Sequence, residues 1–273
     1  DIYKNYLRED ISGDARRAFN KLLTELKDAI NLFSKYIPRI IRKSLLKGAG
    51  FMPFSIWLPY PRAEKVLDDA KNWFEKTTKP VFMWIHLMDA HEPYFPPEKY
   101  RSVDKNTISI VNRRLRFARG WLPKEDVEIL HRLYIDNIKY IDDVLNDFLD
   151  NILDENTIAI ITADHGEQFL EHGGIGHLNW NMYDEQLHIP LIILNCGKEK
   201  KDNLVSLIDV APTIAYLADI EIQGFMGNVL LEDYEEKPVF FAGYDKKWNV
   251  LYGMRTKEWK LFRGVNGWEL YNV

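Results

Sequence analysis

The stretch TIAIITADHGEQFLEHGGIGHLNWNMYDEQLHIPLIIL, residues 157–194, decides the fold and carries most of the chemically active side chains. Its two ends, 157–162 and 189–194, are continuously apolar runs of a length typical of strands buried on both faces. An acid, a histidine and a glycine follow the first run almost at once, and three more histidines lie further along the stretch. Because ligands bind beyond the carboxyl ends of the strands in open α/β sheets, we expect a site just after residue 162.

Helical and apolar segments alternate on both sides of this stretch. Apolar spacing predicts helices over 62–74, from Pro123 to Leu149, and over 209–218. The apolar run 81–87 indicates a further buried strand. Strands that alternate with helices predict an α/β fold, with a mostly parallel sheet sandwiched by helices.

The two ends of the chain follow other patterns. After residue 224, short apolar runs separated by turn residues predict an antiparallel arrangement. We therefore expect an α/β domain over 1–223 and a small C-terminal antiparallel β subdomain over 224–273. Apolar residues at intervals of three and four predict a helix over 14–37. The basic segment 39–47 is interpreted as a surface helix or connector, with contact to an acidic membrane surface as the alternative.

Composition excludes several classes of protein. Hydrophobic residues make up 46% of the 273 residues, enough for a packed core. Lys and Arg number 36 against 41 Asp and Glu, and a net charge of -5 does not supply the basic field of a nucleic-acid binder. The only cysteine, Cys196, excludes a disulfide framework and a zinc finger and favours a reducing, cytoplasmic compartment. No apolar run approaches the ~20 residues that span a bilayer, so no transmembrane segment is expected.

The strongest chemical signal is the motif Asp-His-Gly-Glu at 164–167. A carboxylate and an imidazole are both suitable ligands for a divalent cation, and neighbours on a bending loop can converge on one ion. The structural alternative is an N-cap aspartate beside a hydrogen-bonded histidine. His177 follows a glycine-rich loop that suits its return to the same place, while Asp89 and His91 follow the run 81–87. These residues favour a site over the structural alternative.

Four segments in the same order resemble sulfatases of the alkaline phosphatase superfamily. KPVFMWIHLMDAHEPYFPPEKY, residues 79–100, resembles the family's strand and histidine-x-proline segment. Residues 157–194 resemble its Asp-His-Gly metal segment, glycine-rich loop and next strand. LVSLIDVAPTIAYLADI, residues 204–220, resembles the following helix, and GMRTKEWKLFRGVNGWELYNV, residues 253–273, resembles its C-terminal hairpin. The resemblance covers about 62–273 and matches residues 1–60 only loosely.

The resemblance implies roles for individual residues. Asp164 and His165 fall on metal ligands. His91 falls on a position that contacts the sulfate or phosphate oxygens or protonates the leaving group. His177 falls where many sulfatases keep a lysine near the substrate oxyanion and where some phosphoryl-transferring relatives keep a histidine.

Four other residues near the motifs have less defined roles. For Asp89 a structural role is weighed against a role in the site. Glu167 belongs to the motif but has no assigned mechanism. His172 and His188 are interpreted as structural.

The sequence departs from the family pattern in its metal ligands and its nucleophile. Calcium-type sulfatases commonly pair aspartate with asparagine, whereas imidazole in that position favours Mn²⁺, Fe or Zn²⁺ over Ca²⁺. The metal is therefore predicted to be Mn²⁺, Zn²⁺ or Ca²⁺. The family's nucleophile, a formylglycine or a Thr/Ser, lies with a further metal-binding acid in an N-terminal segment that matches nothing here. We expect that part of the domain, and any formylglycine, to lie outside this chain.

The function predicted from the sequence is metal-dependent hydrolysis of a sulfate ester. The substrate is a small-molecule, glycan or lipid sulfate or phosphate ester, and nucleic acid is not an expected partner. The first alternative is a phosphodiesterase or a phosphoryl or phosphoethanolamine-type transferase of the same superfamily. The second is a metal-binding fragment that is catalytically incomplete. No oligomeric state is predicted.

Overall fold

The computed structural model describes residues 58–273, apart from 79, 198–201 and 222. The chain forms two compact units, Asp1–Asp154 and Glu155–Val273. The predicted helix over 14–37 and the basic segment 39–47 lie outside the described residues. The predicted domain boundary at residue 224 stays a prediction.

The regular secondary structure in the described part of the first unit is helical. The helices are α3 (Ala63–Phe74), α4 (Lys105–Ala118) and α5 (Lys124–Ile152), with short 3-10 turns at Glu98–Tyr100 and Arg119–Trp121. The predicted helices over 62–74 and from Pro123 are confirmed as α3 and α5. None of the helices in the described part of the chain is long and apolar enough to cross a membrane.

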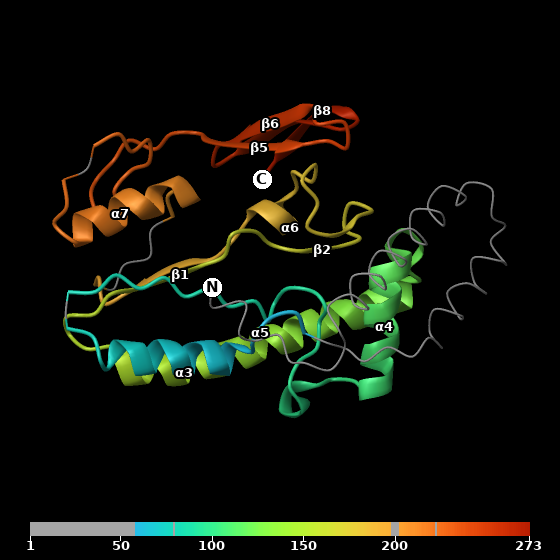
Figure 1. Ribbon diagram of the computed structural model, residues 1–273. Helices are drawn as coiled ribbons and strands as arrows, with labels where there is room; N and C mark the ends of the chain where they lie inside the picture. The colour runs from blue at the N-terminus through green and yellow to red at the C-terminus, as the bar shows by residue number, and fades with distance from the viewer. Residues whose placement is uncertain (1–57, 79, 198–201, 222) are drawn as a thin grey trace. The chain divides into compact units, whose positions relative to one another are not determined.

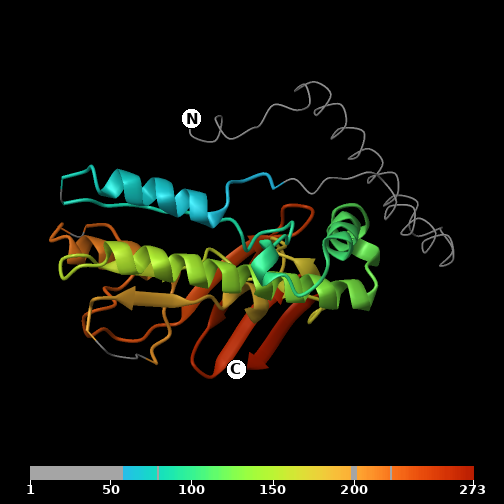
Figure 2. The same ribbon diagram turned by 90° about the horizontal axis from the view of Figure 1, so that it is seen from below.

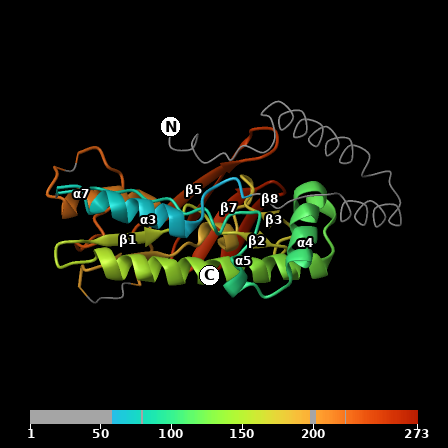
Figure 3. The ribbon, with the colours of Figure 1, turned by 60° about the horizontal axis from the view of Figure 1, so that its bottom comes forward.

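Helix α3 runs along α5 in the same direction (Figures 2 and 3). The Glu64 backbone N–H donates to the Tyr140 hydroxyl at 3.2 Å, and Lys71 Nζ donates to Asn151 Oδ1 at 3.0 Å. Helix α4 also packs on α5, and the Asp104 carboxylate caps its N-terminus by accepting from two backbone N–H groups. The core of this unit consists of one face of each helix, including the buried side chains of Leu67, Ile108, Leu115, Leu130, Leu133 and Tyr140.

The second unit begins with a pair of strands, β1 (Ala159–Thr162) and β4 (Leu191–Leu194). They are antiparallel, with Ala159 opposite Leu194 and Thr162 opposite Leu191. The prediction of a mostly parallel sheet is therefore wrong for this pair, and the described residues contain no parallel pairing. A parallel connection needs a crossover of a dozen or more residues, usually a helix. The segment between β1 and β4 contains only a hairpin and a four-residue helix.

The apolar run 81–87 is not a strand of any sheet in the described residues. Its side chains alternate in exposure, and Phe82 and Trp84 are 67% and 74% exposed. The prediction of a buried strand from this run is therefore not met. A strand is defined by hydrogen bonds to a neighbour, and the apolar letters of a run do not specify that neighbour.

Two short strands and two helices complete the part of the second unit that precedes its large sheet. Strands β2 (Gln168–Phe169) and β3 (Ile175–Gly176) form an antiparallel hairpin, with Gln168 opposite Gly176. Helix α6 (Asp184–Leu187) follows, and α7 (Val210–Leu217) comes after a 3-10 turn at Leu207–Asp209. Helix α7 confirms the helix expected over 209–218.

The predicted antiparallel C-terminal strands form one four-stranded sheet (Figure 1). The strands are β5 (Val239–Tyr244), β6 (Val250–Arg255), β7 (Trp259–Gly264) and β8 (Gly267–Asn272), paired in that order. One face is packed on Met182 through Leu251 and Phe262, with Trp180, Tyr183 and Phe241 around them. The alternation of buried and exposed residues along β7 is the period of two that a sheet covered on one face requires.

Candidate active site

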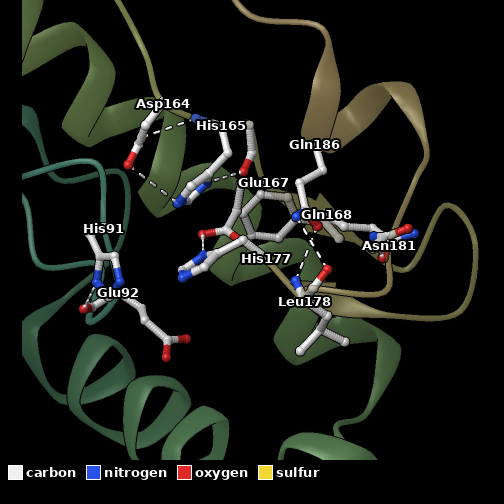
Figure 4. A network of polar contacts seen from close by, with 12 residues as sticks. His91, Glu92, Asp164, His165, Glu167, Gln168, His177, Leu178, Asn181 and Gln186 are labelled. Atoms are coloured by element: carbon white, nitrogen blue, oxygen red, sulfur yellow. Dashed lines mark hydrogen bonds and ion pairs between the residues drawn. The ribbon is translucent and has the colours of Figure 1, made fainter. Parts of the chain in front are cut away.

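The turn after β1 holds the predicted metal ligands. The Asp164 Oδ1 accepts a hydrogen bond from the backbone N–H of His165 at 3.0 Å, and Asp164 Oδ2 lies 3.8 Å from His165 Nε2 (Figure 4). The other ring nitrogen, His165 Nδ1, lies 2.8 Å from the Gly166 carbonyl oxygen. A carbonyl oxygen only accepts, so Nδ1 carries the proton. The imidazole therefore directs Nε2 to the side where Asp164 Oδ2 lies.

The next acid of the motif, Glu167, contacts His177. Glu167 Oε1 and Oε2 lie 3.2 Å and 3.4 Å from His177 Nδ1. The Glu167 side chain is 5% exposed and that of His177 is 26% exposed. The His177 ring also stacks on the His165 ring, with centroids 4.3 Å apart and an interplanar angle of 28°. The structure thus brings Asp164, His165, Glu167 and His177 into one cluster in the second unit (Figure 4).

Close backbone packing holds this cluster against α6. The Gly166 N–H donates to the Gln186 carbonyl at 2.8 Å. A Cβ at Gly166 would overlap the Glu185 carbonyl oxygen, which explains why the motif needs glycine here. The Gln186 side chain accepts from the Leu178 N–H at 3.0 Å and donates to the Leu178 carbonyl at 3.2 Å. These two bonds fix the chain directly after His177.

Three other supports of the cluster were not predicted from the sequence. Gln168 is 2% exposed, and its side-chain oxygen accepts a hydrogen bond from Asn181. Gln186 supplies the bonds to Leu178. These amides have no spacing or composition that distinguishes them from surface residues, so only their contacts in the structure reveal them.

The donor atoms of Asp164 and His165 fit one side of a divalent metal site. Ligand atoms of such an ion lie about 2.0–2.2 Å from it, so two of them can be at most ~4.4 Å apart. The 3.8 Å between Asp164 Oδ2 and His165 Nε2 meets that limit. Donation from the second ring nitrogen to a backbone carbonyl is also the usual arrangement of a metal-bound histidine. The described residues contain no group of three or more His, Cys, Asp or Glu that could hold an ion.

Asp89 lies in the first unit and is 1% exposed. Its carboxylate accepts from the Ala63 backbone N–H at 2.7 Å, at the start of α3, and from Arg62 Nη1 at 3.1 Å. Burial raises the pKa of Asp89, while the bonds from Arg62 and Ala63 act in the opposite direction. All of these contacts are those of a residue that anchors the start of a helix.

His91 also lies in the first unit, in the segment after Asp89. Its N–H donates to the Met88 carbonyl at 3.0 Å, and its carbonyl accepts from the Tyr60 hydroxyl at 2.7 Å. His91 Nδ1 lies 2.6 Å from the Glu92 carbonyl oxygen, so the ring carries its proton on Nδ1. The Glu92 carboxylate is paired with Arg119. The backbone around His91 is therefore tied at several points.

The two histidines interpreted as structural have contacts of different kinds. The His172 ring stacks on Tyr183 at 3.6 Å between centroids, and its Nδ1 lies 3.2 Å from Glu185 Oε2. His188 is exposed and follows the last residue of α6. Neither belongs to the cluster around His165.

Comparison with known proteins decides the family. The sulfatase family model matches residues 6–220, well over half of the chain. The chain belongs to the sulfatase family. The match begins at residue 6, so it includes N-terminal residues that the resemblance in the sequence had covered only loosely.

Curated sulfatases are among the similar proteins. Arylsulfatase K of Gallus gallus is 27% identical over 253 residues, covering 79% of this chain and 44% of its own length. Arylsulfatase K of Homo sapiens is 26% identical over 203 residues, covering 66% and 35%. The uncharacterized sulfatase YidJ of Escherichia coli is 38% identical over 166 residues, covering 54% and 33%. The chain therefore spans less than half the length of these relatives.

A solved structure supports the fold of the family. The phosphonate monoester hydrolase of Agrobacterium radiobacter aligns with a TM-score of 0.60 over 76% of this chain and 53% of its own. Its sequence identity is 18%, so this likeness concerns the fold alone. The chain thus has the alkaline phosphatase/sulfatase-like architecture in its coarse form, although its described residues do not contain the parallel sheet.

Proposed function

We propose that the protein hydrolyses sulfate esters by in-line displacement at sulfur. Membership of the sulfatase family supports this reaction class. The observation that carries the proposal is the cluster in which the His177 ring stacks at 4.3 Å on His165, beside Asp164. An oxyanion donor next to a pair of metal ligands is the arrangement that ester cleavage at sulfur or phosphorus needs.

Asp164 and His165 hold the divalent metal in this proposal, through Asp164 Oδ2 and His165 Nε2. When bound, the ion supplies Lewis-acid polarisation of a non-bridging oxygen and activation of the nucleophile. Gly166 keeps the turn closed against α6, and its carbonyl holds the proton on His165 Nδ1. The metal is proposed to be Mn²⁺, Zn²⁺ or Ca²⁺, and the nitrogen ligand favours the first two.

The family resemblance gives two histidines roles on the ester. His177 stabilises the negative charge that develops on the sulfuryl oxygens, worth about 3 kcal/mol by comparison with other oxyanion donors. The role that the family resemblance gives His91, a residue of the first unit, is to bind the ester oxygens or, with a second proton on Nε2, to protonate the leaving oxygen as the bond from sulfur to that oxygen breaks. The bond that forms joins sulfur to a nucleophile that we do not place among the described residues; formylglycine is the nucleophile that the family implies.

Phosphoryl chemistry is the second candidate. The nitrogen ligand from His165 suits Zn²⁺ or Mn²⁺ better than Ca²⁺, and the resemblance places His177 where some phosphoryl-transferring relatives keep a histidine. A phosphodiesterase, or a transferase acting on phosphoethanolamine-type groups, would use the same cluster. The substrate in either case is a small-molecule, glycan or lipid ester. Local histidines and a bound cation suit its anionic group, although the protein as a whole is acidic.

Metal binding and turnover test these assignments separately. We expect calorimetry of the full chain to detect Mn²⁺ or Zn²⁺ binding that His165→Ala weakens at least tenfold. His188→Ala is the matched control, because this exposed histidine lies outside the cluster. Unchanged metal affinity in His165→Ala would contradict the metal assignment.

Turnover of an aryl sulfate and of a bis-aryl phosphate, each with Mn²⁺, Zn²⁺ and Ca²⁺, separates the two functions. Faster cleavage of the sulfate, lost in His165→Ala and kept in His188→Ala, supports the proposal. Faster cleavage of the phosphate diester replaces it with the second candidate. Metal binding without cleavage of either ester would identify the chain as a metal-binding fragment that is catalytically incomplete.

A further inference from the structure

We propose that one end of the C-terminal sheet binds the surface of a membrane that contains anionic lipids. This hairpin end comprises residues 244–250, around the β5–β6 turn, and residues 263–268, around the β7–β8 turn. It carries apolar and basic side chains together, as do protein surfaces that lie at a lipid–water interface. The proposal goes beyond ester hydrolysis and does not depend on it, because membrane binding is measured without turnover.

The strand order brings the two turns to the same end of the sheet. The four strands pair in the order β5-β6-β7-β8, and each pair is antiparallel. In such an arrangement the chain reverses at alternate ends, so the β6–β7 turn lies at the opposite end from the other two. The register agrees, because Tyr252, Arg263 and Trp268 form one row across three strands. Side chains of both turns therefore meet the same surface.

Large apolar side chains are exposed at the hairpin end. Trp248 in the β5–β6 turn is 78% exposed, and Val265 in the β7–β8 turn is 58% exposed. Tyr244, Val250 and Trp268 beside them are also exposed. These last three lie on the outer face of the sheet, since exposed and less exposed positions alternate along their strands. A group of exposed apolar side chains of this size indicates an interaction surface.

The β5–β6 turn presents Trp248 in an unusual backbone conformation. Its φ of 65° lies in the left-handed region, which bulky residues rarely adopt. Asp245 fixes this turn, because its carboxylate accepts from the Lys247 N–H at 2.7 Å and from the Asn249 N–H at 2.9 Å. The Asp245 carbonyl also accepts from the Trp248 N–H at 3.0 Å. Such conformations persist where neighbouring contacts determine them, and they occur often at functional positions.

The charge of the hairpin end is opposite to that of the whole chain. The protein has a net charge of -5, whereas the hairpin end has three basic residues, Lys246, Lys247 and Arg263, and one acid, Asp245. Lys247 and Arg263 form no ion pair with the described residues. The positive charge complements the negative surface of an anionic membrane, where each basic residue strengthens binding about fivefold, or ~1 kcal/mol.

Two other occupants fit the hairpin end less well. In a two-fold dimer the same patch lies on both sides of the contact, so a second copy of this chain would bring like charges together. A sulfated polysaccharide would pair with the cations, but it would leave the apolar side chains of Val250 and Val265 in water. A lipid interface receives the apolar and the basic side chains at once, and Trp is a side chain that favours that interface.

The hairpin end also adjoins the segment that leaves the candidate site. The Tyr244 N–H donates to the Asn179 carbonyl at 3.0 Å, and Lys246 Nζ lies 5.0 Å from the centroid of the Trp180 ring. Asn179 follows His177 by two residues. Membrane contact at this end therefore brings the cluster around His177 toward the lipid head groups, where a lipid ester would be found.

Sedimentation of the full chain with vesicles tests the proposal. We expect the protein to pellet with phosphatidylcholine vesicles that contain phosphatidylserine, and to bind pure phosphatidylcholine vesicles more weakly. High salt should weaken the binding, because it screens the charges. Trp248→Ala should weaken binding at least tenfold, because the apolar area that Trp248 buries at the interface is lost, and Lys247→Gln about fivefold. Absence of binding to the anionic vesicles would overturn the inference.

The matched control variants are Trp259→Ala and Lys257→Gln. Both residues are exposed and lie at the opposite end of the same sheet. We expect both variants to bind the anionic vesicles as the unaltered chain does. Because all four substitutions replace exposed side chains, we expect each variant to fold, which thermal unfolding checks. Equal losses at the two ends would overturn the inference, and so would full binding by both hairpin-end variants, because another part of the chain would then make the contact.

A fluorescent probe shows which end of the sheet touches the membrane. Cys196 is the only cysteine, so Cys196→Ser provides a background for a single attached dye. We expect an environment-sensitive dye at Trp248→Cys to shift to shorter wavelength when anionic vesicles are added, and the same dye at Trp259→Cys to keep its spectrum. Pelleting without vesicles would identify self-association. Binding to heparin without a spectral shift on vesicles would identify a polysaccharide surface, and either result would overturn the inference.

Discussion

Asn112 of α4 offers the sharpest test of how the first unit is held together. Its side-chain oxygen accepts from the Tyr94 N–H at 2.8 Å, and its amide nitrogen donates to the carbonyls of Tyr94 at 2.8 Å and Ile108 at 3.0 Å. Tyr94 is 0% exposed and Asn112 is 3% exposed. The Asn112 side chain therefore makes two hydrogen bonds to the Tyr94 backbone that a neighbouring strand would otherwise make. Tyr94 lies three residues after His91.

Asn112→Ala removes both bonds to the Tyr94 backbone at once. A buried polar group that loses its partner costs about 1–3 kcal/mol. Two such groups, less ~0.5 kcal/mol for the better helix propensity of alanine, give a loss of about 3 kcal/mol. At ~2–4 °C for each kcal/mol in a domain of 150–250 residues, the expected fall in Tm is about 6–12 °C.

Thermal unfolding and hydrogen exchange measure this effect. We expect the Tyr94 amide to exchange faster in Asn112→Ala under native conditions, because its hydrogen bond is gone. Asn146→Ala is the matched control, since Asn146 is an exposed residue of α5 whose 3.3 Å bond to Asp150 Oδ2 is a weak one. Its stability should change by less than ~0.5 kcal/mol. If Asn112→Ala matched this control in stability and left Tyr94 exchange unchanged, the reasoning would be refuted.

Further predictions concern the second unit. Asp184→Asn should destabilise this unit by about 2–3 kcal/mol in denaturant unfolding, because Lys260 loses its partner; its Nζ lies 2.5 Å from Asp184 and its side chain is 4% exposed. Lys260→Met should cost less than ~1 kcal/mol in the same measurement. Burial raises the pKa of Asp184, but hydrogen bonds from Lys260 and Arg255 outweigh this effect and lower the pKa below the ordinary 3.8. The stabilisation that Asp184 provides is therefore present above pH 3.8 and is lost as the pH falls below that value. Asp184→Asn should lack this loss of stability in acid. Gly176 has a φ of 85°, so Gly176→Ala should cost about 1–2 kcal/mol and disturb the contact between His177 Nδ1 and Glu167, which NMR of histidine-labelled protein would detect. Gly173 has a φ of 79° and open space around it, so Gly173→Ala should show similar strain without that disturbance.

Local patterns predicted many elements because those patterns reflect interactions within a segment. The helix after Pro123 is readable from its apolar spacing, and α5 begins at Lys124. The antiparallel C-terminal strands are readable from short runs and turn residues, and they form the sheet β5–β8. Helix α4 was not predicted, because its apolar stripe is interrupted by buried polar residues such as Asn112.

Sheet pairing was the main failure, because it depends on partners far away in the chain. The runs 157–162 and 189–194 were predicted to lie in a mostly parallel sheet, yet β1 and β4 are antiparallel. The run 81–87 has the composition of a buried strand but has no strand partner among the described residues. A register is set by contacts between segments, and one sequence does not display them.

The candidate site shows the same division. The sequence singled out Asp164, His165 and His177 from the chemistry of their side chains, and it identified the sulfatase family from four ordered segments. It left Glu167 without a mechanism, because residues ten positions apart have no fixed relation until a hairpin register sets one.

By itself, then, the sequence of this protein determined which residues carry reactive groups, that α3, α5 and α7 are helical, and which family the chain belongs to, since these depend on composition and local order. Only the tertiary structure decided that Glu167 faces His177, that the His177 ring stacks on His165, and that Asp89 anchors α3. The physical reason is that hydrogen bonds and ring contacts act over 3–5 Å, and only the folded chain brings residues distant in sequence within that range.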